Sequence, residues 1–115
     1  MVSNYDKRAH KRLDAGIGYM ALVNDSSLVS IKNISMGGIS LTLPLEMERQ
    51  SVASIDIISG KERLFSLTGS VTWSTFWGHS TVNADISFYE TGFKFTGLDE
   101  KTEGALRDFL KTLKE

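Results

Sequence analysis

The hydrophobic pattern of this chain changes its period once, near Asp99. From residue 17 to residue 95, apolar side chains recur at every second position in short runs, the period of a β-strand with one buried face. After Asp99 they recur at spacings of three and four, the period of an α-helix. The pattern therefore predicts a small β-domain that ends in a single helix.

About six strands fit the alternating part. The turn signal Asn24-Asp25-Ser26 separates the first two runs and predicts a hairpin, and Pro44 ends the third run. The predicted inward or strand-forming positions, in chain order, are Ile17, Tyr19, Ala21, Val23, Val29, Ile31, Ile39, Leu41, Leu43, Val52, Ile55, Ile57, Phe65, Leu67, Gly69, Val71, Trp73, Phe93 and Phe95.

Three aromatic residues near the fifth run need separate expectations. Trp73 is expected in the core. Residues 76–85 are polar and irregular apart from Phe76 and Trp77, so this segment is predicted to be a loop. These two side chains either fold back over the barrel or form a partner-binding patch, and the first reading is favoured because large aromatic side chains are mostly buried.

The predicted helix carries one apolar stripe formed by Leu106, Phe109, Leu110 and Leu113. Asp99 is the predicted N-cap, and the acidic residues of the first turn suit the positive end of the helix dipole. The stripe is expected to cover an opening or a face of the sheet. A closed antiparallel barrel is favoured because closure removes exposed strand edges.

The length of 115 residues suits one domain with one core. We predict a polar, flexible N-terminal arm over residues 1–15, the barrel over residues 16–98 and the helix over residues 99–115. No apolar run approaches the roughly 20 residues that span a bilayer, so no membrane insertion is expected. No signal peptide is recognised, and a cytoplasmic location is the simplest expectation.

Several classes of chemistry find no support in the sequence. The chain has no cysteine, so disulfides, thiolate catalysis and cysteine-based zinc sites are excluded. His10 and His79 lack metal-ligand spacing, and neither a GxSxG nucleophile motif nor a phosphate-binding glycine loop occurs. We therefore predict that the protein is not an enzyme and has no metal or cofactor. The net charge of −1 argues against a general nucleic-acid binder, so anion binding must be local.

Two short clusters could bind such an anion. Arg8 and Arg12 lie four residues apart in the arm, and each guanidinium offers a planar fork of hydrogen-bond donors. The second cluster is the segment NISMGG, residues 33–38. In an extended chain Asn33 and Ser35 point to the same face, while Gly37 and Gly38 allow a tight turn and the close approach of a ligand.

Together, the two clusters resemble the signature of the PilZ domain family, RxxxR followed by [D/N]xSxxG. The segments GSVTW (residues 69–73) and TGFKF (residues 91–95) and the terminal helix are also similar to that family, so the likeness extends from about Tyr5 to Leu113. The turn PLEMERQS lacks a glycine that is often seen there in the family. The resemblance implies a six-stranded antiparallel PilZ-type β-barrel with one C-terminal α-helix.

The resemblance also implies a ligand, the bacterial second messenger cyclic di-GMP. Arg8 and Arg12 would read guanine and phosphate, since an arginine fork matches the O6 and N7 acceptors of guanine. By the same resemblance, Asn33 and Ser35 would hydrogen-bond the ligand, and Gly38 would keep the barrel wall clear of side chains. Lys7 and Gly37 would support the site. The number of ligand molecules, one or two, stays open.

A signalling role follows as a hypothesis. The arm would order over the ligand and change a surface that an unidentified effector protein binds. The alternative is a PilZ-like interaction protein that does not bind the nucleotide. A small barrel that binds DNA or RNA through its basic arm is disfavoured by the net charge and by the lack of an alternating aromatic and basic pattern.

Overall fold

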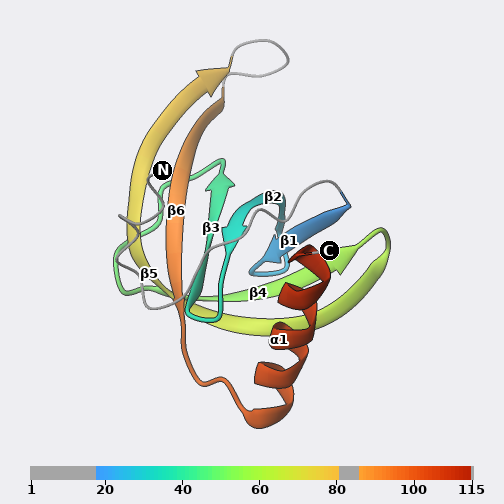
Figure 1. The fold of residues 1–115 in the computed structure, drawn as a ribbon. Coiled ribbons are helices and arrows are strands. Elements are labelled where there is room, and N and C mark those ends of the chain that lie inside the picture. Colours follow the sequence, from blue (N-terminus) through green and yellow to red (C-terminus); the bar gives the residue numbers. More distant parts are fainter. Residues whose placement is uncertain (1–17, 81–85, 115) are drawn as a thin grey trace, which may run out of the picture.

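The structure, a computed structural model, describes residues 18–80 and 86–114. Its elements follow the order β1 Tyr19–Val23, β2 Ser27–Ile34, β3 Gly38–Leu43, β4 Val52–Ser59, β5 Glu62–Ser80, β6 Ile86–Phe95 and α1 Glu100–Lys114. The six strands close into a barrel in the order β1-β2-β3-β6-β5-β4, and every neighbouring pair is antiparallel (Figure 1). The predicted antiparallel barrel with one C-terminal helix is confirmed. The predicted arm lies outside the described residues.

The β1–β2 hairpin forms where the sequence predicts it. Asn24 and Asp25 adopt positive φ angles of 51° and 57°, which these two residue types tolerate better than most others. The Ser26 N–H donates to the Val23 carbonyl at 3.0 Å, which closes the turn. The Asn24 side-chain oxygen also accepts from the Ser54 N–H at 3.0 Å, so the turn is tied to β4.

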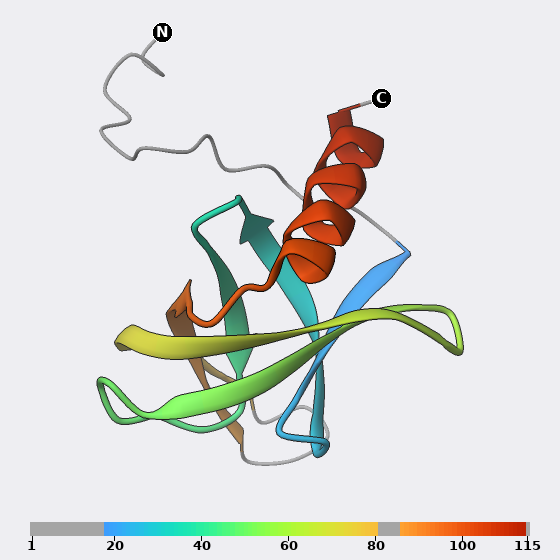
Figure 2. The same cartoon turned by 90° about the horizontal axis from the view of Figure 1, so that it is seen from below.

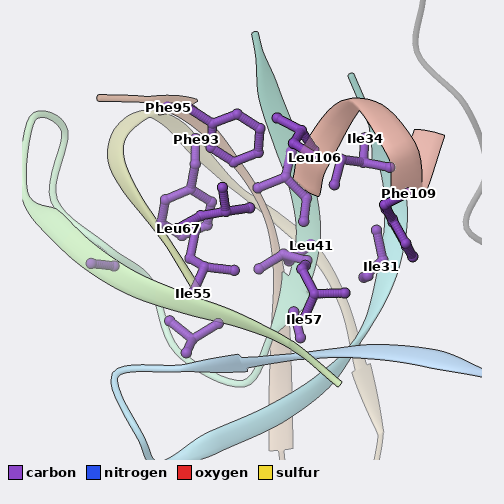
Figure 3. Close-up of a cluster of buried hydrophobic side chains, with 14 of the residues drawn as sticks. Ile31, Ile34, Leu41, Ile55, Ile57, Leu67, Phe93, Phe95, Leu106 and Phe109 are labelled. Atoms are coloured by element: carbon purple, nitrogen blue, oxygen red, sulfur yellow. The ribbon is translucent and has the colours of Figure 1, made fainter. Parts of the chain in front are cut away.

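The barrel interior is filled by side chains from all six strands and from the helix (Figure 3). Full burial of one such apolar side chain contributes roughly 1.5–3 kcal/mol. Val52, in contrast, is 65% exposed and faces outward, whereas its neighbour Ala53 is buried. The buried apolar residues are Ala21, Val23, Ile31, Ile34, Ile39, Leu41, Leu43, Ala53, Ile55, Ile57, Leu67, Val71, Phe93, Phe95, Leu106, Phe109 and Leu110.

Helix α1 begins with the predicted cap. The Asp99 carboxylate accepts a hydrogen bond from the Thr102 N–H at 2.7 Å. This bond to the backbone, together with one to the Thr102 side chain, lowers the pKa of Asp99 below its ordinary value. Glu100 and Glu103 occupy the first turn, where the helix dipole favours negative charge.

Helix α1 lies against the barrel, where it contacts β5 (Figures 1 and 2). Leu106 is fully buried. The Phe109 ring meets Tyr19 of β1 edge to face at a centroid distance of 4.9 Å, and it meets Phe65 of β5 at 5.6 Å. The helix therefore completes the core, as its spacing predicts.

Strand β5 is longer than the sequence indicated. The prediction of an irregular loop from residue 76 is wrong, because residues 76–80 pair with residues 86–89 of β6. Backbone groups form this ladder, so polar side chains do not end it. Phe76 and Trp77 are 57% and 64% exposed, so the prediction that they cover the barrel is also wrong. The Phe76 ring instead contacts Tyr89 at a centroid distance of 5.9 Å.

Candidate ligand-binding site

The segment between β2 and β3 is a tight turn built around Ser35. The Ser35 N–H donates to the Gly38 carbonyl at 2.8 Å. Its hydroxyl oxygen accepts from the N–H groups of Gly37 at 3.1 Å and Gly38 at 3.3 Å. Ser35 is 4% exposed. The hydroxyl therefore holds the turn in shape, as the Asn-Ser-Gly cluster in the sequence also suggests.

Gly38 is needed for strand pairing. It lies opposite Lys94 in the β3–β6 ladder, and a Cβ at this position would be 2.2 Å from the carbonyl oxygen of Phe93. Because that oxygen belongs to the backbone, it cannot move aside as a side chain can. Only glycine lets β3 approach β6 this closely.

A β-bulge in β2 decides where Asn33 points. Ile31 pairs with Leu41 and Asn33 with Ser40, so Lys32 is an extra residue in the ladder. Ile31 and Ile34 are both buried in the core, which a regular alternation would not allow. The bulge thereby turns Asn33 to the outside of the barrel, where it is half-buried. Ser35 lies beyond the end of the strand, and its hydroxyl oxygen accepts from the N–H groups of Gly37 and Gly38 within the turn. The contacts of Asn33 and Ser35 with a ligand stay a prediction.

A second bulge moves Trp73 out of the core. Val71 pairs with Phe93 and Trp73 with Gly92, so Thr72 is the extra residue of β5. Val71 and Phe93 are buried, whereas Trp73 is only half-buried. A Cβ on Gly92 would lie 2.4 Å from two atoms of the Trp73 indole, so the ring rests on the glycine. The prediction that Trp73 belongs to the core is wrong.

The two bulges bring four residues into one row across four strands. Asn33 of β2 lies opposite Ser40 of β3, Ser40 lies opposite Gly92 of β6, and Gly92 lies opposite Trp73 of β5. We call this row on the outer face of the barrel the outer wall. The Ser40 hydroxyl is buried and makes no hydrogen bond within the described structure. The outer wall therefore combines an amide, an unpartnered hydroxyl and an aromatic ring.

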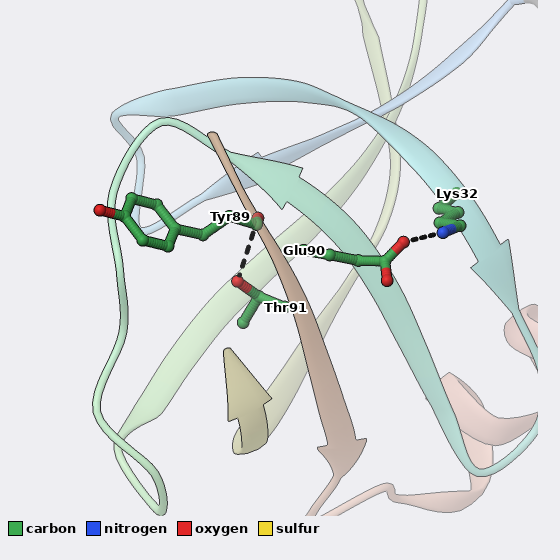
Figure 4. A network of polar contacts seen from close by, with 4 residues as sticks. All are labelled: Lys32, Tyr89, Glu90 and Thr91. Atoms are coloured by element: carbon green, nitrogen blue, oxygen red, sulfur yellow. Dashed lines mark hydrogen bonds and ion pairs between the residues drawn. The ribbon is translucent and has the colours of Figure 1, made fainter. Parts of the chain in front are cut away.

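An ion pair lies beside the outer wall. Lys32, the extra residue of β2, pairs with Glu90 of β6 across the intervening strand β3 (Figure 4). Tyr89 and Thr91 flank Glu90 in β6, and the Thr91 hydroxyl donates to the Tyr89 carbonyl at 3.4 Å (Figure 4). Because Lys32 compensates the carboxylate of Glu90, this carboxylate repels an anion on the outer wall less strongly.

A separate hollow of about 290 Å³ is formed on β1, β2, β3 and β6. Its lining contains no charged side chain, so it is poorly suited to a ligand with two phosphates. The lining residues are Met20, Leu28, Val29, Ser30, Thr42 and Phe88. The outer wall and the adjacent turn are the better candidate site.

The remaining predicted site residues, Lys7, Arg8 and Arg12, lie outside the described residues. Within residues 18–80 and 86–114, no group of three or more histidine, aspartate or glutamate side chains could hold a metal ion. In the same part of the chain, no helix is long and apolar enough to cross a membrane.

The family model of the PilZ domain matches residues 6–112. This chain belongs to the PilZ domain family. The matched range contains Arg8, Arg12, Asn33, Ser35 and Gly38. No curated protein matches the chain in sequence.

Solved structures share the PilZ fold with this chain. The PilZ domain of YcgR from Escherichia coli, solved with c-di-GMP, has a TM-score of 0.72 at 17% identity, over 94% of this chain and 92% of the other. The K. pneumonia MrkH–c-di-GMP complex has a TM-score of 0.68 at 15% identity, over 93% of this chain and 52% of MrkH. Bacillus subtilis MotI, an inhibitor of motility, has a TM-score of 0.63 at 13% identity, over 92% and 50%. This PilZ domain thus spans about half the length of MrkH and MotI.

Proposed function

We propose that this PilZ domain binds cyclic di-GMP on the outer wall and the adjacent turn, and that it signals binding to another protein. Membership of the family and the c-di-GMP complexes of YcgR and MrkH support this choice of ligand. The observation that carries the proposal is the row of Asn33, Ser40 and Trp73 beside the glycine turn. Asn33 and Trp73 offer an amide and an aromatic surface at one place on the barrel, and the Ser40 hydroxyl is buried between them.

The chemistry of the ligand matches these groups. Guanine presents O6 and N7 as adjacent acceptors, and the forks of Arg8 and Arg12 are proposed to bind these atoms and the phosphates. The amide of Asn33 can both donate to and accept from a base edge. The half-exposed indole of Trp73 can stack on a purine, a contact worth about 1–3 kcal/mol per base.

The other signature residues serve the site by shaping it. In this proposal, Ser35 and Gly38 keep the turn and the β3–β6 pairing in the form that receives the ligand. Gly37 supports the same turn through its hydrogen bond to Ser35. Lys7, next to Arg8 in the sequence, adds positive charge for the phosphates.

Isothermal titration calorimetry tests the ligand directly. The parent protein should bind cyclic di-GMP and should bind neither GTP nor a short oligonucleotide with comparable affinity. Arg8→Ala and Arg12→Ala should each lose about 1.5–3 kcal/mol of binding free energy, roughly ten- to a hundredfold in Kd. Arg107→Ala removes an exposed arginine of α1 and serves as the matched control. An Arg8→Ala variant that binds as tightly as the parent would contradict the assigned role.

Tryptophan fluorescence tests whether the ligand binds at the outer wall. In a Trp77→Phe background Trp73 is the single tryptophan, so its emission reports on the outer wall. Cyclic di-GMP should change this emission in a saturable way, with the Kd that calorimetry gives. A calorimetric signal without a change in Trp73 emission would place the ligand elsewhere on the domain.

The signalling part of the proposal concerns the arm and a partner protein. The ligand would order residues 5–15 and thereby alter a surface for an effector in the cytoplasm. Amide hydrogen exchange in residues 5–15 should slow when cyclic di-GMP is added. The alternative, an interaction protein that does not bind the nucleotide, is favoured if the parent protein gives no calorimetric signal with cyclic di-GMP.

A further inference from the structure

Two lysines lie on the outer face beside the candidate site, and their electrostatic surroundings differ. The charge of Lys32 is compensated by the carboxylate of Glu90. Lys94 is exposed, and no described carboxylate forms an ion pair with it. Lys94 is therefore the uncompensated cation of the two.

The register of β6 places Lys94 next to both halves of the described site. Phe93 and Phe95 point into the core, so Lys94 points outward on the same face as Gly92, about 7 Å further along the strand. Lys94 lies directly opposite Gly38 on β3. Because Gly38 has no side chain, Lys94 has no side-chain neighbour at the paired position of β3.

We infer that Lys94 binds a phosphate group of the ligand beside the turn between β2 and β3. This inference rests on the proposed function, because it takes cyclic di-GMP as the ligand. The position is outside both signature segments, and neither of them indicates it. Lysine acts as a compact point charge with three donors, which suits a phosphate oxygen better than the two adjacent acceptors of guanine.

The charge of the whole protein makes such a local cation important. The net charge is −1, so no general positive field attracts a ligand with two phosphates. The attraction must come from single cations within about one Debye length, roughly 8–10 Å, of the site. Lys94 supplies one from strand β6 of the barrel, whereas Arg8 and Arg12 come from a different segment of the chain.

The test compares lysine variants by calorimetry with cyclic di-GMP at low and high salt. Lys94→Gln should weaken binding about fivefold at low salt, an effect between that of an exposed ion pair and that of a charged hydrogen bond. The difference from the parent should shrink as salt is added, because salt screens the charge. Lys94→Arg should retain most of the affinity.

Lys61→Gln is the matched control. It removes the same charge at an exposed position in the turn between β4 and β5 and should leave the Kd unchanged. Equal losses for Lys94→Gln and Lys61→Gln would reduce the effect to net charge and overturn the inference. Parental affinity in Lys94→Gln, with Arg8→Ala still impaired, would overturn the inference and leave the proposed function intact. If the parent protein itself does not bind, the proposed function fails.

Discussion

The indole ring of Trp73 occupies the space that a side chain on Gly92 would need. A Cβ on Gly92 would be 2.4 Å from two ring atoms, well inside van der Waals contact. The two residues face each other across β5 and β6 on the outside of the barrel. The Trp73 ring therefore packs directly on the backbone of Gly92, which has no side chain to block it.

Gly92→Ala should therefore displace Trp73 and destabilise the fold. Forcing an extra methyl into this contact should cost about 1–3 kcal/mol of unfolding free energy. Urea unfolding measures the loss, and Trp73 emission in the Trp77→Phe background reports the displacement. Gly104→Ala is a useful control because an added Cβ meets nothing within 4 Å in the helix, and it should stabilise the protein by roughly 0.5–1 kcal/mol. Equal effects of Gly92→Ala and Gly104→Ala on stability would show that Trp73 does not depend on the space at Gly92.

Gly38→Ala should destabilise the protein in the absence of any ligand. The added Cβ would meet the Phe93 carbonyl oxygen at 2.2 Å, so β3 and β6 must separate locally. We expect a loss of about 3 kcal/mol or more, at the upper end of the range for overpacked sites. Thermal unfolding of the ligand-free variant measures it. A parental Tm with impaired binding of cyclic di-GMP would mean that Gly38 serves the ligand alone.

Ser35→Ala should weaken the turn before it affects any ligand. The N–H groups of Gly37 and Gly38 lose the hydroxyl oxygen that accepts from them. A partner left without its hydrogen bond in a buried turn costs about 1–3 kcal/mol. Chemical denaturation of the ligand-free protein checks this value. Ser66→Ala, at an exposed position of β5, should stay within about 0.5 kcal/mol of the parent.

The cap of α1 should make stability depend on pH at the acidic end. The pKa of Asp99 is lowered in the folded protein by the hydrogen bonds with Thr102, so the unfolded state binds the proton more tightly. The stabilisation is complete well above the ordinary value of 3.8, falls as the pH drops through 3.8 and disappears below the folded pKa.

Urea unfolding at a series of pH values tests this dependence. Asp99→Asn keeps an oxygen that can cap the helix but removes the titrating group. The Asn variant should lose this part of the pH dependence, while Asp99→Ala should lose the cap at every pH. If the loss of stability at acidic pH is unchanged in Asp99→Asn, other carboxylates cause it.

Much of the fold could be predicted because it depends on local periodicity. The buried faces of β1, β3 and β6, the turn at Asn24 and Asp25, and the stripe of α1 follow from spacings of two, three and four residues. The signature segments also indicated where to look for a ligand. The positions of Lys7, Arg8 and Arg12 relative to the barrel stay a prediction, since these residues lie outside the described part.

The alternation of the strands, the helix with its cap and the residues of the signature can all be read from the amino-acid sequence. That Asn33 and Trp73 share the outer wall follows from the strand pairing, because the bulges at Lys32 and Thr72 each reverse the side on which the following residues lie. Where a bulge forms depends on how neighbouring strands pair around a closed barrel, and residues far apart in the chain control that pairing. A period of two read along one strand contains no information about its partners. Trp73 therefore lies on the outer face, although the alternation along β5 predicts it in the core.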